Sequence, residues 1–396
     1  MSPVREQAEE RPATPEEAAA VMGRCGAEGR RLRIRGGGTK AGWGRLMAEP
    51  DVEISTAGLD RIVEHNAGDL TAVLQAGVPL ASAQAIFAEA GQMLALDPPL
   101  GPGGDGAAGA TVGGVVSTAD SGPLRHRYGS VRDLVVGIMI ALSDGTLARA
   151  GGKVIKNVAG YDLGKLFSGS FGTLGLIVEV SVRLHPRPRR TATAVGRSGD
   201  PAALQRGASA VAHAPVEAES LDVAWDEGGG AGAVLARFAS ADPGPRVEQT
   251  AGLLREAGLE VEVVLDDDAP RWEAQRGGQR AGPGGAVVKV SSLQSRLADV
   301  VRVAAGLSAG VVGRAGPGLF WVRLPEAPPG DLVDSIEELR RRLAPSPCVV
   351  LDAPADVRGK LDPWGEEPGS MELMRRVKAR FDPAGVCQPG IYVGGI

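Results

Sequence analysis

A glycine-rich stretch between Leu96 and Pro188 constrains the fold of this chain more than any other feature. Glycines recur there in small groups, and short β-branched runs separate the groups. A glycine lets the backbone come close to a ligand because it has no Cβ atom. The pattern therefore predicts a surface kept open for a large flat ligand, and a phosphate-bearing cofactor is the natural candidate.

Length and charge favour a folded chain of more than one domain. The 396 residues exceed one average domain, so we expect two domains that share a long core. The net charge is -5, and no basic stripe with interleaved aromatic residues is present. This composition argues against a nucleic-acid partner.

Cysteine usage and hydropathy bear on metals and location. Cys25, Cys348 and Cys387 lie far apart and form no metal-binding spacing, so we expect neither a metal site nor an iron-sulfur cluster in this chain. No apolar run reaches the roughly 18 residues of a membrane helix, and the N-terminus lacks the apolar core of a signal peptide. We expect a cytoplasmic protein that reaches the inner face of the cell membrane only through partners.

The first part of the chain reads as α+β. Residues 1–13 are charged and are expected to be flexible. A helix should begin after Thr14, because a threonine cap, Pro15 in the first turn and Glu17 three residues on are typical of a helix start. RLRIR then predicts a strand that runs into a glycine turn, and further strands lead to a helix over about residues 79–90.

The glycine-rich composition ends at HPRPRR, a segment whose prolines predict a hinge. From there to about residue 350 we expect two rounds of helices and strands, and these predict a two-layer cap with an antiparallel sheet. The predicted helices lie near 201–213, 246–257, 293–305 and 332–343, and the predicted strands are SLDVAW, AVLARF, LEVEVVL, AVVKVSS, AGVVGR, LFWVRL and PCVVLD. A last helix near 370–380 precedes prolines and glycines that return the chain over the surface.

Two familiar phosphate motifs fit poorly. Gly104, Gly106 and Gly109 match G-x-G-x-x-G, but a dinucleotide fold needs an apolar strand before the motif and a helix after it. Prolines interrupt the segment before the motif, where the strand would have to lie. The segment after it, TVGGVVST, contains two glycines and several β-branched residues and therefore predicts at most a weak helix. AGYDLGKL departs from a P-loop in its spacing, and Leu166 replaces the Ser or Thr that would hold magnesium.

Two loops remain as candidates for holding a diphosphate. Residues 36–39 could turn successive backbone N–H groups toward one anion, and residues 110–114 could offer a second set from the opposite side. The alternative is a pair of tight surface turns.

A family resemblance rests on five segments, namely RGGGTK, ATVGGVVSTADSG, RHRYGSVRDLVVG, KNVAGYDLGKLFSGSFGTLGLI and the terminal FDPAGVCQPG. The chain resembles the vanillyl-alcohol-oxidase or PCMH type of FAD-binding domain, and within it the FAD-binding E subunits of bacterial glycolate oxidases, also called glycolate dehydrogenases. The resemblance covers about residues 33–186 and the C-terminus, and it extends to the region between only in layout.

The resemblance implies an α+β fold with four parts. These are a flexible N-terminus (1–13), a two-subdomain PCMH-type FAD-binding domain (14–188), a ferredoxin-like α+β cap domain (189–350) and a C-terminal segment that packs back on the FAD-binding domain (351–396). Noncovalent FAD is expected, because RGGGTKAGWG holds neither the histidine nor the cysteine that bonds to the flavin in some relatives.

The resemblance also implies which residues contact FAD. The two loops would cradle the diphosphate, the segments near Ser117 and Tyr128 would line the cofactor's path, and the remaining segments would approach the flavin ring. The implied residues are Gly36, Gly37, Gly38, Thr39, Lys40, Pro98, Ala110, Thr111, Val112, Gly113, Gly114, Ser117, Thr118, Tyr128, Gly129, Asn157, Gly160, Tyr161, Asp162, Gly172, Thr173, Gly175 and Ile177.

Lysines are few in this chain, yet three of them fall between Lys153 and Lys165. Either they place a cation near the pyrimidine edge of the flavin, where it would stabilise the anionic reduced form, or they are solvated loop lysines. Asp162 could accept a hydrogen bond or pair with Lys156 or Lys165.

The usual base for a 2-hydroxy acid is missing, because no histidine follows His213. Arg314, Arg323 and Lys289 could bind a carboxylate, and Tyr128 or Tyr161 could position a hydroxyl, although each residue type is more often structural. No catalytic residue is assigned.

The resemblance implies a subunit of a glycolate oxidase complex. A sister subunit bearing FAD and histidines would oxidise glycolate to glyoxylate, and an iron-sulfur subunit would pass electrons to quinone. The alternatives are a free-standing FAD-dependent oxidase of another alcohol or hydroxy acid, and a non-catalytic flavin-binding scaffold.

Overall fold

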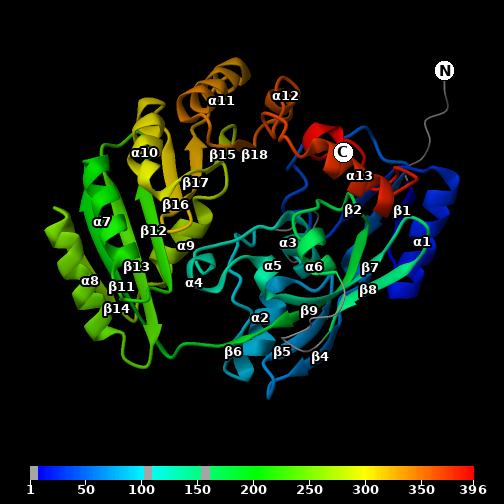
Figure 1. The fold of residues 1–396 in the computed structure, drawn as a ribbon, viewed down its shortest axis with the longest axis horizontal. Coiled ribbons are helices and arrows are strands. Elements are labelled where there is room, and N and C mark those ends of the chain that lie inside the picture. Colours follow the sequence, from blue (N-terminus) through cyan, green and yellow to red (C-terminus); the bar gives the residue numbers. More distant parts are fainter. Residues whose placement is uncertain (1–7, 102–108, 153–160) are drawn as a thin grey trace.

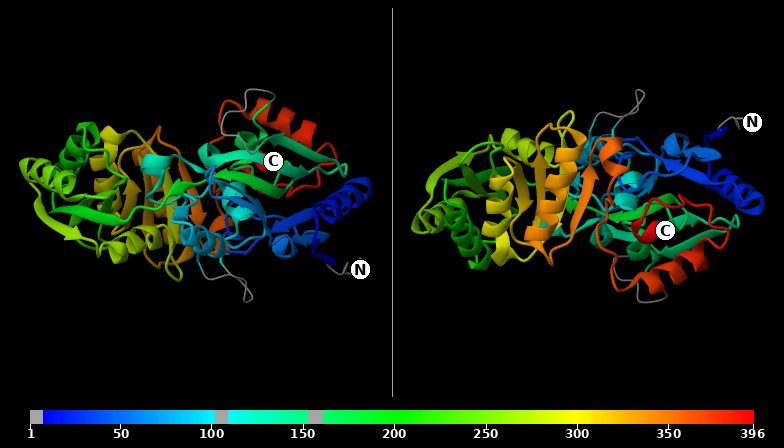
Figure 2. Two further views of the ribbon diagram at one scale, coloured as in Figure 1. Left: turned by 90° about the horizontal axis from the view of Figure 1, so that it is seen from below. Right: turned by 90° about the horizontal axis from the view of Figure 1, so that it is seen from above.

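A computed structural model describes residues 8–101, 109–152 and 161–396 and shows an α+β fold. Two large regions lie side by side in Figure 1. The N-terminal region (residues 8–186) is on the right and the cap (residues 190–352) is on the left. The views in Figure 2 show the same two regions end to end along the long axis, with the C-terminal segment (residues 355–396) against the N-terminal region.

The chain begins with a small parallel sheet of β1 (Ala8–Glu10), β3 (Val52–Ser55) and β2 (Leu32–Arg35), in the order β1-β3-β2. Helix α1 (Pro15–Glu28) starts as predicted, because the Thr14 side chain accepts from the Glu17 amide at 3.1 Å. Strand β1 corrects the expectation of a flexible segment through residue 13, since its three residues pair with β3.

A five-stranded antiparallel sheet forms the centre of the N-terminal region. Its order is β4-β5-β9-β7-β8, with β4 (Ile62–Asn66), β5 (Thr71–Gln75), β9 (Leu176–Arg183), β7 (Val135–Ala141) and β8 (Leu147–Gly151). Alternate side chains of these strands enter two different cores, as the period of a strand requires. One core holds α2 (Leu80–Glu89), α3 (Val112–Thr118), α5 (Val131–Leu134) and α6 (Leu163–Phe167), and the other holds α1, β2 and β3.

The cap consists of two βαββαβ units. The first is β11 (Arg190–Ser198), α7 (Pro201–His213), β12 (Ser220–Trp225), β13 (Gly232–Ser240), α8 (Gly244–Glu256) and β14 (Glu260–Leu265). The second is β15 (Ala286–Ser291), α10 (Leu297–Gly306), β16 (Gly310–Arg314), β17 (Leu319–Leu324), α11 (Pro329–Leu343) and β18 (Cys348–Asp352).

The two units share one antiparallel sheet with the order β14-β11-β13-β12-β16-β17-β15-β18. Within each unit the first strand lies between the third and the fourth, which is the ferredoxin-like order, and β12 pairs with β16 to join the units. Helices α7, α8, α10 and α11 cover one face and bury it in a single core. The predicted two-layer, ferredoxin-like cap is confirmed.

Two cap elements escaped the sequence analysis. Strand β11 follows directly on HPRPRR, where we expected only a hinge, and its small residues give little apolar alternation. Helix α9 (Ala269–Gly277) is too polar to show a helical apolar period. It nevertheless covers part of the second sheet face, because Trp272 is buried there and its Nε1 donates to the Thr193 hydroxyl at 2.9 Å.

The HPRPRR segment is also tied to the N-terminal region. Strand β10 (His185–Pro186) pairs with β6 (Gln92–Met93), so the crossing to the cap begins from a fixed position.

The C-terminal segment returns to the N-terminal region after α12 (Ala355–Arg358) and α13 (Met371–Phe381). Helix α13 packs against α6, where the ring of Phe381 lies 5.5 Å from that of Phe167. Leu32 of β2 bridges Cys387, and the Lys378 ammonium donates to the Thr173 carbonyl at 2.6 Å, the Cys387 carbonyl at 2.8 Å and the Asp382 carboxylate at 2.7 Å. Asp382 is 2% exposed, and the Lys378 interaction holds its pKa below the ordinary value against the opposing effect of burial.

None of the helices within the described ranges is both long enough and apolar enough to cross a membrane.

Lys378→Met should lower the free energy of unfolding by about 3 kcal/mol or more, because it leaves the buried Asp382 carboxylate without its cation. Urea unfolding followed by circular dichroism measures the change. Lys360→Met, at an exposed position with the same change of side chain, should stay within about 0.5 kcal/mol of wild type. Equal losses of unfolding free energy in both variants would contradict the conclusion that Lys378 stabilises the C-terminal segment through Asp382.

Candidate functional site

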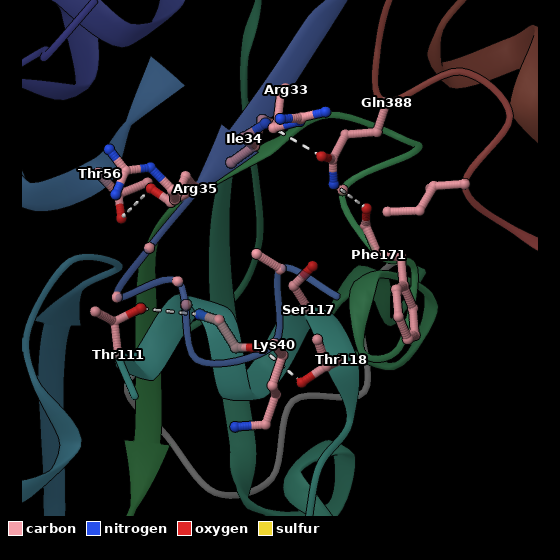
Figure 3. A pocket seen from close by; sticks show the side chains of 18 of the residues that line it. Arg33, Ile34, Arg35, Lys40, Thr56, Thr111, Ser117, Thr118, Phe171 and Gln388 are labelled. Atoms are coloured by element: carbon pink, nitrogen blue, oxygen red, sulfur yellow. Dashed lines mark hydrogen bonds between the residues drawn. The ribbon is translucent and has the colours of Figure 1, made fainter. Parts of the chain in front are cut away.

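A hollow lies between β2, the loop after it, α3 and the segment around Phe171 (Figure 3). It encloses about 1300 Å³ of empty space, including the part open to solvent. Its lining includes all of the first predicted loop and part of the second, together with residues of the C-terminal segment. The predicted residues that line it are Gly36, Gly37, Gly38, Thr39, Lys40, Ala110, Thr111, Gly113, Gly114, Ser117, Thr118, Gly172, Gly175 and Ile177.

The loop from Gly36 to Lys40 lines this hollow, and its backbone donors are free. Strand β2 ends at Arg35, and Gly38 turns the chain with a φ of 73°. Within the described parts of the chain, the amide hydrogens of these five residues meet no protein acceptor. Successive free N–H groups in a concave turn suit an anion, so this loop fits the diphosphate of a dinucleotide cofactor.

Two glycines of this loop are fixed by contact with the second loop. A Cβ on Gly37 would overlap the carbonyl oxygen of Gly109, and a Cβ on Gly36 would overlap the Thr111 hydroxyl. The two loops therefore touch backbone to backbone, and this contact holds the free amides in place.

The second loop differs from its prediction, because residues 112–118 form helix α3 where we expected at most a weak one. The Thr111 side chain caps the helix by accepting from the Gly114 amide at 3.3 Å. Val112, Val115 and Val116 are buried, and Gly113 packs so closely on Ala76 that a Cβ would overlap it. Tertiary packing thus outweighs the poor helix propensity of glycine and valine.

The second loop also fails as a second set of donors. The amides of Ala110, Val112 and Gly113 donate to the carbonyls of Leu100, Val78 and Ala76 at 2.8–2.9 Å, and the Gly114 amide is taken by the cap. That prediction was wrong for these four amides, because they are taken by the segment between β5 and α2, by the Leu100 carbonyl and by the Thr111 cap. The loop shapes the hollow, while the free amides come from the first loop.

Several other predicted residues lie outside the lining. Val112 and Pro98 are buried elsewhere, and Gly129 follows α4 (Arg125–Tyr128). Thr173 donates its hydroxyl to the Ser170 carbonyl at 2.7 Å. Asn157 and Gly160, like Lys153 and Lys156, lie outside the described residues.

Tyr161 and Asp162 are placed at the surface. Tyr161 is 91% exposed. Asp162 caps α6 by accepting from the Lys165 amide at 3.1 Å and pairs with the Lys165 ammonium at 3.1 Å, which agrees with the structural pairing considered for it.

Tyr128 joins the N-terminal region to the cap and does not line the hollow. Its hydroxyl donates to Glu219 at 3.2 Å, and its ring lies 4.7 Å from that of His185. Burial, together with the Glu219 carboxylate, raises the pKa of Tyr128 to about 12. The phenol therefore stays protonated as a donor.

Sequence reasoning missed Gln388, which links two walls of the hollow. Its Oε1 accepts from the Ile34 amide at 3.2 Å, and its Nε2 donates to the Phe171 carbonyl (Figure 3). The terminal FDPAGVCQPG carried the family resemblance and contained this residue, but no local pattern indicates a partner so distant in sequence.

The first loop is also tied to the cap. The Lys40 ammonium pairs with the buried Asp120 at 3.1 Å and lies over the Trp43 ring. Trp43 Nε1 donates to Asp352, at the end of β18, at 2.8 Å. Two nitrogens of the Arg280 guanidinium donate to the same carboxylate. The position of the cap is thereby coupled to the anion-binding loop.

The three cationic candidates in the cap differ in their partners. Arg314 is fully buried and donates to Asp222 at 2.8 Å and to Gln279, and the exposed Arg323 pairs with Glu227 at 2.8 Å. Lys289 forms no ion pair with any described residue and lies over Trp321, with its ammonium 5.9 Å from the ring centroid. Burial and the nearby Arg125 lower the pKa of Lys289.

Two acids at the junction are protonated more readily than usual. Burial raises the pKa of Asp222 to about 7 despite Arg314, and burial raises the pKa of Asp97 to about 6 despite Arg314, Arg276 and the Leu124 amide. Arg276 of α9 lies 3.6 Å from Asp97, so this carboxyl group also spans the two regions.

Comparison with known proteins agrees with the geometry. Residues 7–151 match the family described as FAD binding domain. The chain is 39% identical over 158 residues to glycolate oxidase subunit GlcE of Escherichia coli (strain K12), which covers 40% of this chain and 43% of that protein. It is 34% identical over 159 residues to glycolate oxidase subunit GlcD of Bacillus subtilis (strain 168), which covers 40% of this chain and 33% of that protein. The matched parts thus span less than half of these relatives.

The fold itself is shared more widely. An alkyldihydroxyacetonephosphate synthase structure superposes with a TM-score of 0.70 at 14% identity, over 96% of this chain and 75% of that one. Residues 7–151 thus match an FAD-binding domain, and FAD is the cofactor that this match supports. The free amides of the first loop and the long hollow beside them fit the diphosphate and the extended shape of FAD.

Gly37→Ala should abolish FAD retention, because the added methyl group must push the first loop away from Gly109. The flavin absorption of the purified protein measures retention, and circular dichroism reports whether the variant is folded. Gly42→Ala is the matched control, since its methyl group meets only the Arg358 guanidinium at 4.0 Å. A folded Gly37→Ala protein with wild-type flavin content would exclude this loop as the diphosphate site.

Asp97→Asn should change the pH dependence of stability. A carboxyl group with a raised pKa in the folded state stabilises the fold below its unfolded pKa of 3.8, and this contribution is lost as the pH rises to about 6. The variant should therefore gain stability relative to wild type between pH 3.8 and about 6, with no further change above that range. Urea unfolding across this pH series measures the difference, and a constant difference would contradict the assignment.

Proposed function

We propose that this chain is the FAD-binding subunit of a complex that oxidises glycolate or a similar 2-hydroxy acid. The observation that carries the proposal is the loop of free amides at Gly36 to Lys40, in a chain that is similar over part of its length to the glycolate oxidase subunits. An FAD-dependent oxidoreductase acting on an alcohol carbon is the activity that these features support.

Oxidation of glycolate to glyoxylate removes a hydride from the alcohol carbon and a proton from the hydroxyl group. Bound FAD supplies the hydride acceptor. The chain's own contribution is to bind the diphosphate through the first loop and to hold that loop against the cap through Trp43, Arg280 and Asp352.

Lys289 is the residue that we assign to the substrate carboxylate. It lies on the cap sheet face that carries Trp321 and Arg314, and its ammonium forms no ion pair within the described ranges. A carboxylate would give this half-buried cation the partner that it lacks.

Among its described residues, the hollow offers no evident side chain to accept the proton of the substrate hydroxyl group. No histidine lines the hollow, and burial lowers the pKa of both His126 and His185. We therefore propose that a sister subunit bearing FAD and histidines carries out the oxidation with this chain, and that an iron-sulfur subunit takes the electrons on to quinone. In this proposal the complex is cytoplasmic and meets the membrane through those partners.

The test begins with the spectrum of the purified chain. We expect a yellow protein that glycolate does not bleach without oxygen until the copurifying sister subunit is added. A folded protein that stays colourless when titrated with FAD would overturn the proposal. Bleaching by glycolate without any partner would overturn the partner's role and would favour a free-standing oxidase.

Lys289→Met should raise the KM for glycolate in the assembled complex by about tenfold or more, because a hydrogen bond to a charged group is lost. Steady-state rates with a dye acceptor measure KM and kcat separately, and flavin content should remain unchanged. Lys360→Met provides the control with the same loss of charge at an exposed position. An unchanged KM in Lys289→Met would remove this residue from the substrate site.

A further inference from the structure

Arg358, the last residue of α12, lines the hollow from the C-terminal segment. The chain leaves the cap at Asp352, and α12 follows after a short connection. A Cβ on Gly42 would lie 4.0 Å from a terminal nitrogen of Arg358, and a Cβ on Gly359 would lie 3.7 Å from Leu46. Helix α12 therefore packs against the chain just beyond the first loop. The sequence analysis gave Arg358 no role.

Arg358 differs from the other cations of the hollow because it has no anionic partner. Among the described residues, five cationic side chains line the hollow. Four of them lie within 4.0 Å of a carboxylate: Arg33 and Arg35 pair with Glu53, Lys40 with Asp120, and Arg45 with Asp362. The guanidinium of Arg358 has neither an ion pair nor a hydrogen bond with any residue that the structure describes, and its Nε is buried without an acceptor.

The carboxylate of Asp352 does not supply the missing partner. It accepts from Trp43 Nε1 and from two nitrogens of Arg280, so its oxygens are already engaged. Burial lowers the pKa of Arg358, and Asp352 opposes this effect only as a more distant charge. Arg358 nevertheless remains charged, because an arginine does not lose its proton in a protein. A cation that has lost water without gaining a partner favours an anion in the hollow.

The free amides of the first loop lie on the same hollow, and they bind an anion only through partial charges. The diphosphate of FAD carries two full negative charges on adjacent phosphate groups. A guanidinium can donate two parallel N–H groups to phosphate oxygens, which gives both charge and geometry. The loop and one unpaired arginine beside it are therefore complementary to a diphosphate.

We propose that Arg358 binds the diphosphate of FAD together with the first loop, so that the C-terminal segment forms part of the cofactor site. The inference rests on FAD as the occupant of the hollow, and it goes beyond the proposed function, which uses the first loop alone. Arg358 also lies outside residues 7–151, the part of the chain that matches the FAD binding domain family. Cofactor affinity would then depend on a residue that follows the cap.

The experiment titrates FAD into the full-length chain after its flavin has been removed, and isothermal titration calorimetry gives the dissociation constant. Arg358→Gln should raise the Kd for FAD by about tenfold or more, because hydrogen bonds to a charged group are lost. Arg358→Lys keeps the charge without the planar fork and should raise the Kd by a smaller factor. Circular dichroism reports whether each variant is folded.

Lys360→Gln is the matched control. It removes one positive charge two residues from Arg358, at an exposed position that does not line the hollow. Its Kd for FAD should equal that of wild type.

Salt distinguishes charge pairing from a structural role. The ratio of the Kd of Arg358→Gln to that of wild type should fall as salt is added, because ions screen the attraction between arginine and phosphate. A role in the shape of the hollow would leave this ratio constant.

Three results would overturn the proposal. These are a wild-type Kd in Arg358→Gln, an equal rise in Lys360→Gln, and a ratio that does not change with salt. A wild-type chain that does not bind FAD would overturn the assignment of the cofactor as well. Glycolate takes no part in these titrations, so the result does not depend on which substrate is oxidised.

Discussion

The backbone contact between Gly37 and the carbonyl of Gly109 is the constraint on which the site depends. It allows the loop after β2 to lie directly on the loop before α3, and the amides of Gly36 to Lys40, which line the hollow, have no acceptor among the described residues. Any side chain at Gly37 would separate the two loops. The amides of Ala110, Val112 and Gly113 in the second loop are bonded instead to the carbonyls of Leu100, Val78 and Ala76.

The two regions meet through polar contacts and through an apolar cluster, in which Trp43 and Phe171 pack with Val287, Leu319, Trp321 and Leu351 of the cap. Asp352 holds Trp43 and Arg280, Glu219 holds Tyr128, and Arg276 reaches Asp97. Buried polar pairs contribute little net stability, but breaking one of them is costly. They consequently favour one arrangement of the cap over the cofactor loop, as a site built between two regions requires.

The sequence was informative where local chemistry decides the structure. The Thr14 cap, the turn after Arg35 and the repeated order of cap elements follow from patterns within a few residues. The sequence was misleading where contacts between residues far apart in the chain decide the structure. Helix α3 forms because Gly113 fits against Ala76, the amides of Val112 and Gly113 are taken by the carbonyls of Val78 and Ala76, and the Tyr128 hydroxyl donates to Glu219 across the junction. Gln388 belongs to the hollow only because the C-terminus returns to β2.

The electrostatic surroundings of Lys289 favour a negatively charged substrate at the proposed site. Burial and Arg125 disfavour its charged form, and Asp120 opposes them only in part. An ammonium in this position has lost hydration without gaining a carboxylate among the described residues. An incoming hydroxy acid would restore that interaction, whereas an uncharged alcohol would not. Within the proposed function, selectivity for an acid over a plain alcohol therefore follows from a cation that no described carboxylate pairs with.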